Sequence, residues 1–327
     1  MIKFFRQSYI IQYVVIALLA IALWVPAFIS GKATTGLESP VTPVFNILDH
    51  LLGASSIAQH VVAFVLLLLE ALIFNAILIN NQITGKVGTM GAFVFILLMS
   101  LTCTQTQFYP FALATLFLIL MLRSFFEVHL SPTPELSLLN AGMLIALASM
   151  CYFPAILLVL WAIIALPMAR KGSLRLQLIP LLGFFIVYFV YFVCVYLFGD
   201  FRAVMHGYVD CFSSFQLTVA GFNYKIIIFL SVLAIATGLL LFGGNSANME
   251  KSVAVRSKIS MTVILLPFAI FILFVGGNPL MHGLFFLVLT VIIAYTFSYM
   301  GNTGWANLFL TLLLIFVFVN HYYFKIL

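Results

Sequence analysis

The sequence predicts an all-α protein, a polytopic bundle of transmembrane helices. Apolar residues make up 65% of the 327-residue chain and charged residues only 7%, a balance that a water-soluble globular domain cannot place on its surface. The apolar residues also form runs of about 20, the length that an α-helix needs to cross a bilayer. We therefore expect residues 1–327 to form a single integral membrane domain without a soluble domain.

Most spans follow directly from these apolar runs. The first run begins after a basic N-terminus and continues through Ile29, beyond the ~7 to 15 residue core of a signal peptide, so we interpret it as an uncleaved span. The expected spans are residues 9–29, 57–79, 87–103, 109–126, 176–198, 225–243, 259–275, 280–298 and 305–324.

Residues 137–168 form a further apolar stretch, which Pro154 interrupts. A single helix of this length would measure roughly 48 Å, well over a ~30 Å hydrocarbon core. Pro154 has no amide hydrogen and disfavours helix at Phe153. The alternative is a hairpin of two short helices with a turn around 149–154. Such a turn must be buried in protein or line a wet cavity, because its backbone groups need partners.

The basic residues decide between one pass and two. With a cytoplasmic N-terminus and two passes, ten of the 14 Lys and Arg residues lie inside, as the positive-inside rule requires. With one pass, every later loop changes side and the tally becomes seven against seven. We therefore expect a helical hairpin at 137–168 with its turn outside, and about eleven membrane segments. The ten inside residues are Lys3, Arg6, Lys86, Arg123, Arg170, Lys171, Arg175, Lys251, Arg256 and Lys258.

Other features of the composition exclude whole classes of function. The basic residues are scattered in ones and twos and form no stripe, so the net charge of +6 does not indicate a nucleic-acid partner. The four cysteines show neither CxxC spacing nor histidines at metal-ligand intervals. We interpret them as small apolar residues, with a disulfide as the alternative, and predict no metal site. No nucleotide-binding glycine motif is present, and the sequence leaves the cofactor unknown.

Two segments carry a resemblance to known proteins: EALIFNAIL at 70–78 and GMLIALASMCYFPAILLVLWAIIAL at 142–166. Through them the chain resembles an uncharacterised family of bacterial multi-spanning inner-membrane proteins. More distantly, it is similar to the membrane half of the GT-C glycosyltransferases, which use polyprenyl-phosphate-linked sugars. This likeness implies an undecaprenyl-type lipid-linked substrate at the outer membrane face, handled by a glycosyltransferase-like enzyme or a degenerate relative of one.

The GT-C resemblance points to the loop after the first span, where those enzymes carry an acidic base or metal ligand. Here the loop contains Glu38, Asp49 and His50, but no adjacent acidic pair. Two carboxylates and an imidazole are able to bind a divalent cation or abstract a hydroxyl proton. The preferred alternative is a short interfacial helix in VFNILDHLLG, with Asp49 and His50 facing water.

A second outer loop contains Arg202, His206 and Asp210 at helical i, i+4 spacing, which places the three side chains along one helix face. They are candidates for binding a phosphate or sugar head group. A solvated interfacial helix in an aromatic belt explains the same pattern, and we favour it.

Glu70 lies near the middle of the second span, where an ionised acid is costly. We expect it to face the bundle interior as a protonated, hydrogen-bonded packing residue, with a substrate-binding or proton-coupling role as the alternative. Asn75, about 140° around the helix, points to another face. Besides a lipid-handling enzyme, the sequence leaves open a transporter or flippase and a non-catalytic subunit of a membrane complex. The expected partners are membrane lipids, a polyprenyl-phosphate-linked substrate and other membrane proteins.

Overall fold

The computed structural model describes residues 2–7, 9–30, 42, 44, 56–84, 88–101, 110–128, 133–168, 173–213, 253–275, 283–299, 303–319 and 322. These residues form helices and turns, with no β-strand among them, so the all-α prediction is confirmed for this part of the chain. Four helices in it are long and apolar enough to cross a membrane: α4 (Ser56–Asn80), α7 (Pro134–Cys151), α9 (Leu174–Phe198) and α13 (Val253–Val275).

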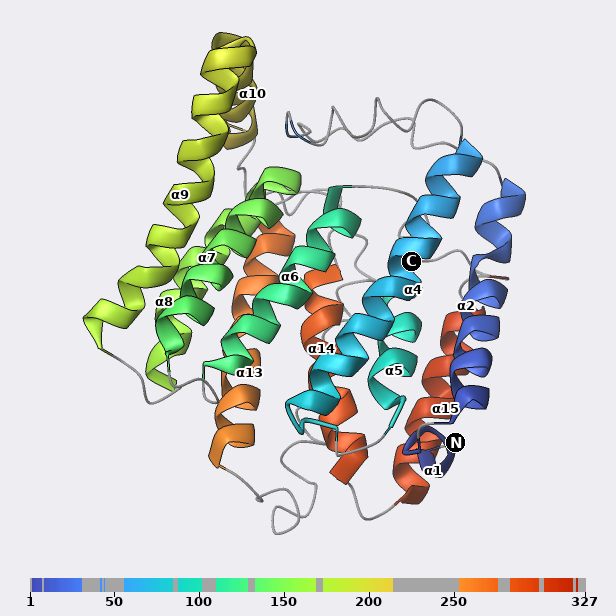
Figure 1. The fold of residues 1–327 in the computed structure, drawn as a ribbon. Helices are drawn as coiled ribbons and strands as arrows, with labels where there is room; N and C mark the ends of the chain where they lie inside the picture. Colours follow the sequence, from blue (N-terminus) through green and yellow to red (C-terminus); the bar gives the residue numbers. More distant parts are fainter. Residues whose placement is uncertain are drawn as a thin grey trace.

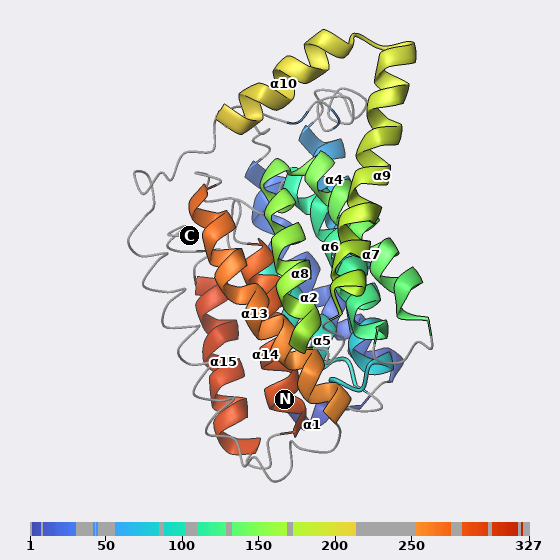
Figure 2. The ribbon, with the colours of Figure 1, turned by 90° about the vertical axis from the view of Figure 1, so that its left-hand side faces the viewer.

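The other elements complete a bundle whose long helices lie side by side (Figures 1 and 2). They are α1 (Ile2–Phe5), α2 (Ile10–Ser30), α5 (Met90–Met99), α6 (Pro110–Glu127), the 3-10 helix η2 (Phe153–Leu157), α8 (Leu158–Met168), α10 (Phe201–Ser213), α14 (Gly283–Tyr299) and α15 (Thr303–Val319). The bundle has two ends. We name them the α1 end, at the bottom of Figure 1, and the α10 end, at the top.

The observed helices match the expected spans unevenly. α2, α4, α6 and α9 begin and end within two residues of the expected positions. By contrast, α5 has only 10 residues, and α13 begins six residues before the expected 259. The expected span 225–243 lies outside the described residues.

The centre of the bundle is formed by α5 and α14, which pack against each other. Every residue of α5 is buried, as is every residue of α14 from Gly283 to Phe297. A helix that is apolar on all sides is stable only when other helices enclose it. Aromatic rings fill the contacts: Phe95 of α5 lies 5.4 Å from Phe74 of α4, and Phe93 stacks on Phe5 at 4.2 Å between ring centres.

The predicted hairpin is present in the structure. α7 ends at Cys151, Tyr152 is extended (φ −133°, ψ 100°), and η2 leads into α8. Pro154 lies in the first turn of η2, where the missing amide costs no hydrogen bond. The reversal therefore falls over 152–157, slightly later than the predicted 149–154. It lies at the α10 end of the bundle (Figure 1).

Two glycines allow α7 and α9 to cross closely. A Cβ atom at Gly142 would lie 1.9 Å from the Pro180 carbonyl oxygen, and one at Gly183 would lie 2.3 Å from the Leu139 carbonyl oxygen. Small residues at helix crossings are the usual means of close packing in membranes, where helices associate through van der Waals contact. This crossing fixes α9 against the hairpin.

Polar side chains hold the helix ends together at the α1 end. Lys258 of α13 donates to Asn81, just past the end of α4, at 2.9 Å to Oδ1 and 3.4 Å to the carbonyl oxygen. Arg6 donates to the Phe297 carbonyl oxygen in the last turn of α14 at 2.7 Å. The last carbonyls of a helix lack partners within the helix. These two cations therefore donate hydrogen bonds to carbonyl oxygens at the ends of α4 and α14.

Candidate functional site

A sharp corner between α9 and α10 creates the main surface feature of the α10 end. Gly199 donates its amide to Val195 in the last hydrogen bond of α9. The next residue, Asp200, caps α10 because its Oδ1 accepts the amides of Arg202 at 3.0 Å and Ala203 at 3.3 Å. α10 then runs obliquely away from the end of α9 (Figure 2).

α10 is amphipathic, with an apolar face turned toward α9. Met205, Tyr208, Val209 and Phe212 share this face and line a groove, whereas the opposite face carries polar residues. At about 100° per residue, Arg202 lies only about 20° from Val209 around the helix. A cation therefore borders the apolar face.

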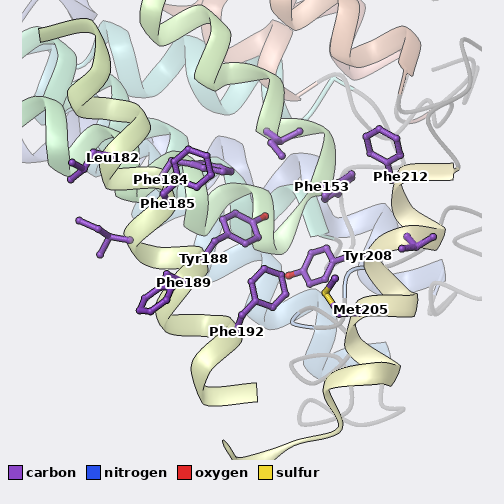
Figure 3. A pocket seen from close by; sticks show the side chains of 13 residues that line it. Phe153, Leu182, Phe184, Phe185, Tyr188, Phe189, Phe192, Met205, Tyr208 and Phe212 are labelled. Carbon is purple, nitrogen blue, oxygen red and sulfur yellow. The ribbon is translucent and has the colours of Figure 1, made fainter. Parts of the chain in front are cut away.

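The groove between α9, α10 and the hairpin turn has a volume of about 840 Å³ (Figure 3). This value lies within the range of about 300 to 1,000 Å³ that is usual for ligand pockets. Its walls are almost entirely apolar. The hairpin contributes Phe153 and Ile156, α10 contributes the four residues named above, and α9 contributes Leu182, Phe184, Phe185, Ile186, Tyr188, Phe189 and Phe192.

Tyr208 is the central ring of this groove. It is buried, and its ring centre lies 6.0 Å from Phe153 of the hairpin, 5.9 Å from Phe192 and 6.3 Å from Tyr188 of α9. Edge contacts of this kind between aromatic rings are favourable. Tyr208 therefore connects the three elements that form the groove.

A hydrogen bond fixes the inner wall of the groove. The Tyr188 hydroxyl lies 2.9 Å from Ser149 Oγ of α7, and Ser149 donates in turn to the Ala146 carbonyl oxygen. This contact satisfies a polar group beside an otherwise apolar wall.

Nearby on α10, burial and then the charge of Asp210 raise the pKa of the Cys211 thiol, so the thiol is not a reactive thiolate.

The structure separates the sequence-predicted site residues. Arg202, His206 and Asp210 do lie on one helix, and all three are exposed, an arrangement that fits the solvated helix face favoured above. Glu70 lines a different cavity, between α2, α4, α5 and α6. Glu38, Asp49 and His50 lie outside the described residues, so a catalytic role for them stays a prediction.

Glu70 matches its prediction in location but not in bonding. It is buried, with 4% of its surface exposed, so it faces the bundle interior as expected. Asn75 points elsewhere, since it donates to the Gly88 carbonyl oxygen and accepts the Ala92 amide. The hydrogen bond predicted for Glu70 is absent at Oε1, which has no partner among the described residues.

Sequence reasoning missed the groove itself. The chain has 35 Phe and 13 Tyr residues, and nothing in their spacing distinguishes Phe153, Tyr188 and Phe192 from those that face lipid. The Gly199–Asp200 pair was the available signal, since a glycine after an apolar run followed by an aspartate is typical of one helix ending and another beginning.

Comparisons with known proteins do not assign this site. A scan against protein-family models and searches of curated proteins and solved structures found no match to the chain.

Proposed function

We propose that this chain is a multi-pass inner-membrane protein that handles an undecaprenyl-type lipid at the outer membrane face. In this orientation the α1 end is cytoplasmic. Six basic side chains are described, and only Arg202 lies at the α10 end. The other five lie toward the α1 end, on the side that the positive-inside rule assigns to the cytoplasm: Arg6, Arg123, Arg175, Arg256 and Lys258.

The observation that carries the proposal is the groove between α9, α10 and the hairpin turn. Its volume of about 840 Å³ and its apolar walls suit a hydrocarbon chain. Aromatic side chains from all three elements face it, among them Phe153, Phe189 and Phe212 (Figure 3). Rigid rings of this kind pack well against the flat, methyl-bearing units of an isoprenoid.

The polar flank of α10 supplies a position for the anionic head group. Arg202 borders the apolar face, and its guanidinium has no ion-pair partner among the described residues. A guanidinium binds phosphate oxygens through two parallel hydrogen bonds. We place the phosphate beside Arg202 and the tail in the groove, with Glu38, Asp49 and His50 as the residues proposed for sugar transfer.

The proposal is tested by the lipid that the protein retains. We expect polyprenyl phosphate to be enriched over phosphatidylglycerol in protein purified in mild detergent, measured by mass spectrometry. Ile186→Trp fills the groove and should lower the retained polyprenyl phosphate severalfold. Val190→Trp is the matched control, because Val190 is also an exposed β-branched residue of α9 but lies outside the groove.

The same assay tests the head-group position. Arg202→Gln should weaken retention by roughly two- to fivefold, as expected for an exposed charge pair, whereas Arg175→Gln at the far end of α9 should not. A lipid content that matches the bulk membrane, or equal loss in the Ile186 and Val190 variants, would overturn the proposal. Stoichiometric protein partners without enriched lipid would instead favour a subunit of a membrane complex.

A further inference from the structure

A second, much smaller space lies between other helices of the bundle, away from the groove. It is formed by α2, α4, α5 and α6, and its walls include Trp24, Glu70, Met99 and Thr115, one from each of these helices. Its volume is about 20 Å³. Glu70 lies near the middle of the 25-residue α4, and Thr115 lies in the second turn of α6.

Two buried polar atoms belong to residues that line this space. Trp24 Nε1, a hydrogen-bond donor, and Glu70 Oε1 both lack a hydrogen-bond partner among the described residues. Trp24 is 2% exposed and Glu70 is 4% exposed. Unpaired buried polar groups are rare in proteins, and each one calls for a partner.

Thr115 offers a third polar group. Its hydroxyl hydrogen is already used, since Oγ1 donates to the Phe111 carbonyl oxygen at 2.8 Å. The oxygen can still accept a hydrogen bond. The space thus combines one free donor, on Trp24, with acceptors on Glu70 and Thr115.

A water molecule fits these groups in both size and chemistry. A cavity needs a volume of about 10 to 15 Å³ to hold one water molecule. A buried water typically makes about three hydrogen bonds. The observed volume of about 20 Å³ is therefore enough for one water molecule. A metal ion would require several more oxygen ligands than the walls provide.

We propose that one water molecule occupies this space and links Trp24 to Glu70. The water accepts a hydrogen bond from the Trp24 indole and donates to Glu70 Oε1 and to Thr115 Oγ1. The carboxyl group of Glu70 is thereby held in the bundle interior by a hydrated polar site. This site is independent of the lipid groove and of the function proposed for it.

Nuclear magnetic resonance of protein labelled with ¹⁵N only at tryptophan tests the proposal. The chain has three tryptophans, and Trp24→Phe identifies the Trp24 indole signal by its loss. We expect magnetisation transfer between water and the Trp24 indole hydrogen. Trp161 is the internal control, because it is equally buried but donates to the Met261 carbonyl oxygen at 3.3 Å; its indole should show no transfer.

Substitutions at Glu70 complete the test. Glu70→Gln keeps an acceptor and should retain the water signal at Trp24, which also demonstrates that the variant folds. Glu70→Leu removes the acceptor and should abolish that signal while leaving the Trp161 signal in place. The absence of water transfer to Trp24 in the wild-type protein, or an unchanged Trp24 signal in Glu70→Leu, would overturn the proposal.

Discussion

Lys258 is a charged side chain that the bundle buries almost completely, with 2% of its surface exposed. Its ammonium group donates hydrogen bonds to the Asn81 carbonyl and side-chain oxygens. Lys258 of α13 therefore caps the end of α4, a different helix. Arg256, two residues earlier on α13, is exposed. Both residues contribute one positive charge to the same end of the protein, yet only Lys258 is enclosed.

This contrast separates a structural role from a role in topology. We expect Lys258→Met to lower the free energy of unfolding by about 1 to 3 kcal/mol, because it leaves buried oxygens of Asn81 unpaired. Arg256→Met removes the same charge from an exposed position and should cost within about 0.5 kcal/mol. Unfolding by denaturant in detergent measures both. An equal decrease in the free energy of unfolding in the two variants would show that stability at this end depends on positive charge and not on the contact with Asn81.

Single residues also show where prediction from sequence ends. The interior location of Glu70 was predictable, because an acid in an apolar run has few favourable environments. The different direction of Asn75 followed from helix geometry alone. The contact of Lys258 with Asn81 and that of Tyr208 with Phe153 were not predictable, since each joins helices that are distant in sequence.

At the scale of elements, the crossing of α7 and α9 is the tightest constraint that the structure shows. Gly142 and Gly183 each lie against a backbone carbonyl of the opposite helix, and backbone cannot move aside as a side chain can. The crossing positions α9, which forms one wall of the groove. The groove therefore depends on two residues that do not line it.

Gly142→Ala should force the two helices apart. A Cβ atom 1.9 Å from the Pro180 oxygen cannot be accommodated without movement of the backbone, and overpacking of this kind costs about 1 to 3 kcal/mol or more. We expect a lower thermal unfolding temperature in detergent and less retained lipid. Gly199→Ala is the control, because its Cβ atom would lie 3.2 Å from the nearest oxygen. A Gly142→Ala variant as stable as Gly199→Ala would contradict the observed crossing.

Element boundaries were predictable only where apolar length alone determines them. α2, α4, α6 and α9 matched because each crosses the bundle in one apolar run. α5 is shorter than expected, and its neighbours enclose all ten of its residues. α13 begins earlier than expected because burial and Asn81 allow Lys258 to lie within the helix. The groove was not predictable, since it exists only when α10 folds beside α9.

At the scale of the whole molecule, the hairpin determines the side on which all later elements lie. Because the chain reverses between α7 and α8, the start of α9 lies at the α1 end, and α10 lies at the opposite end (Figure 1). Five of the six described basic side chains lie toward the α1 end. Under the positive-inside rule, this distribution favours the proposed orientation, with the α1 end in the cytoplasm.

Reporter fusions test this arrangement directly. A reporter fused after Lys171 should be cytoplasmic, and one fused after Ser213, at the end of α10, should be external. The structure requires opposite sides for the two reporters, whereas the charge distribution decides which side is which. Two reporters on the same side would contradict the hairpin, and a reversal of both would contradict only the orientation.

The second arm of the hairpin, formed by η2 and α8, is short, and its length has a consequence for biogenesis. α8 has 11 residues and η2 has five, so α8 measures about 16 Å and the two together about 26 Å. Both lengths fall short of a hydrocarbon core of ~30 Å. An insertion machinery that releases segments one by one would leave α8 without a stable position. We therefore expect α7 and α8 to enter the bilayer as a pair, and α9 to reach its place only after both have done so.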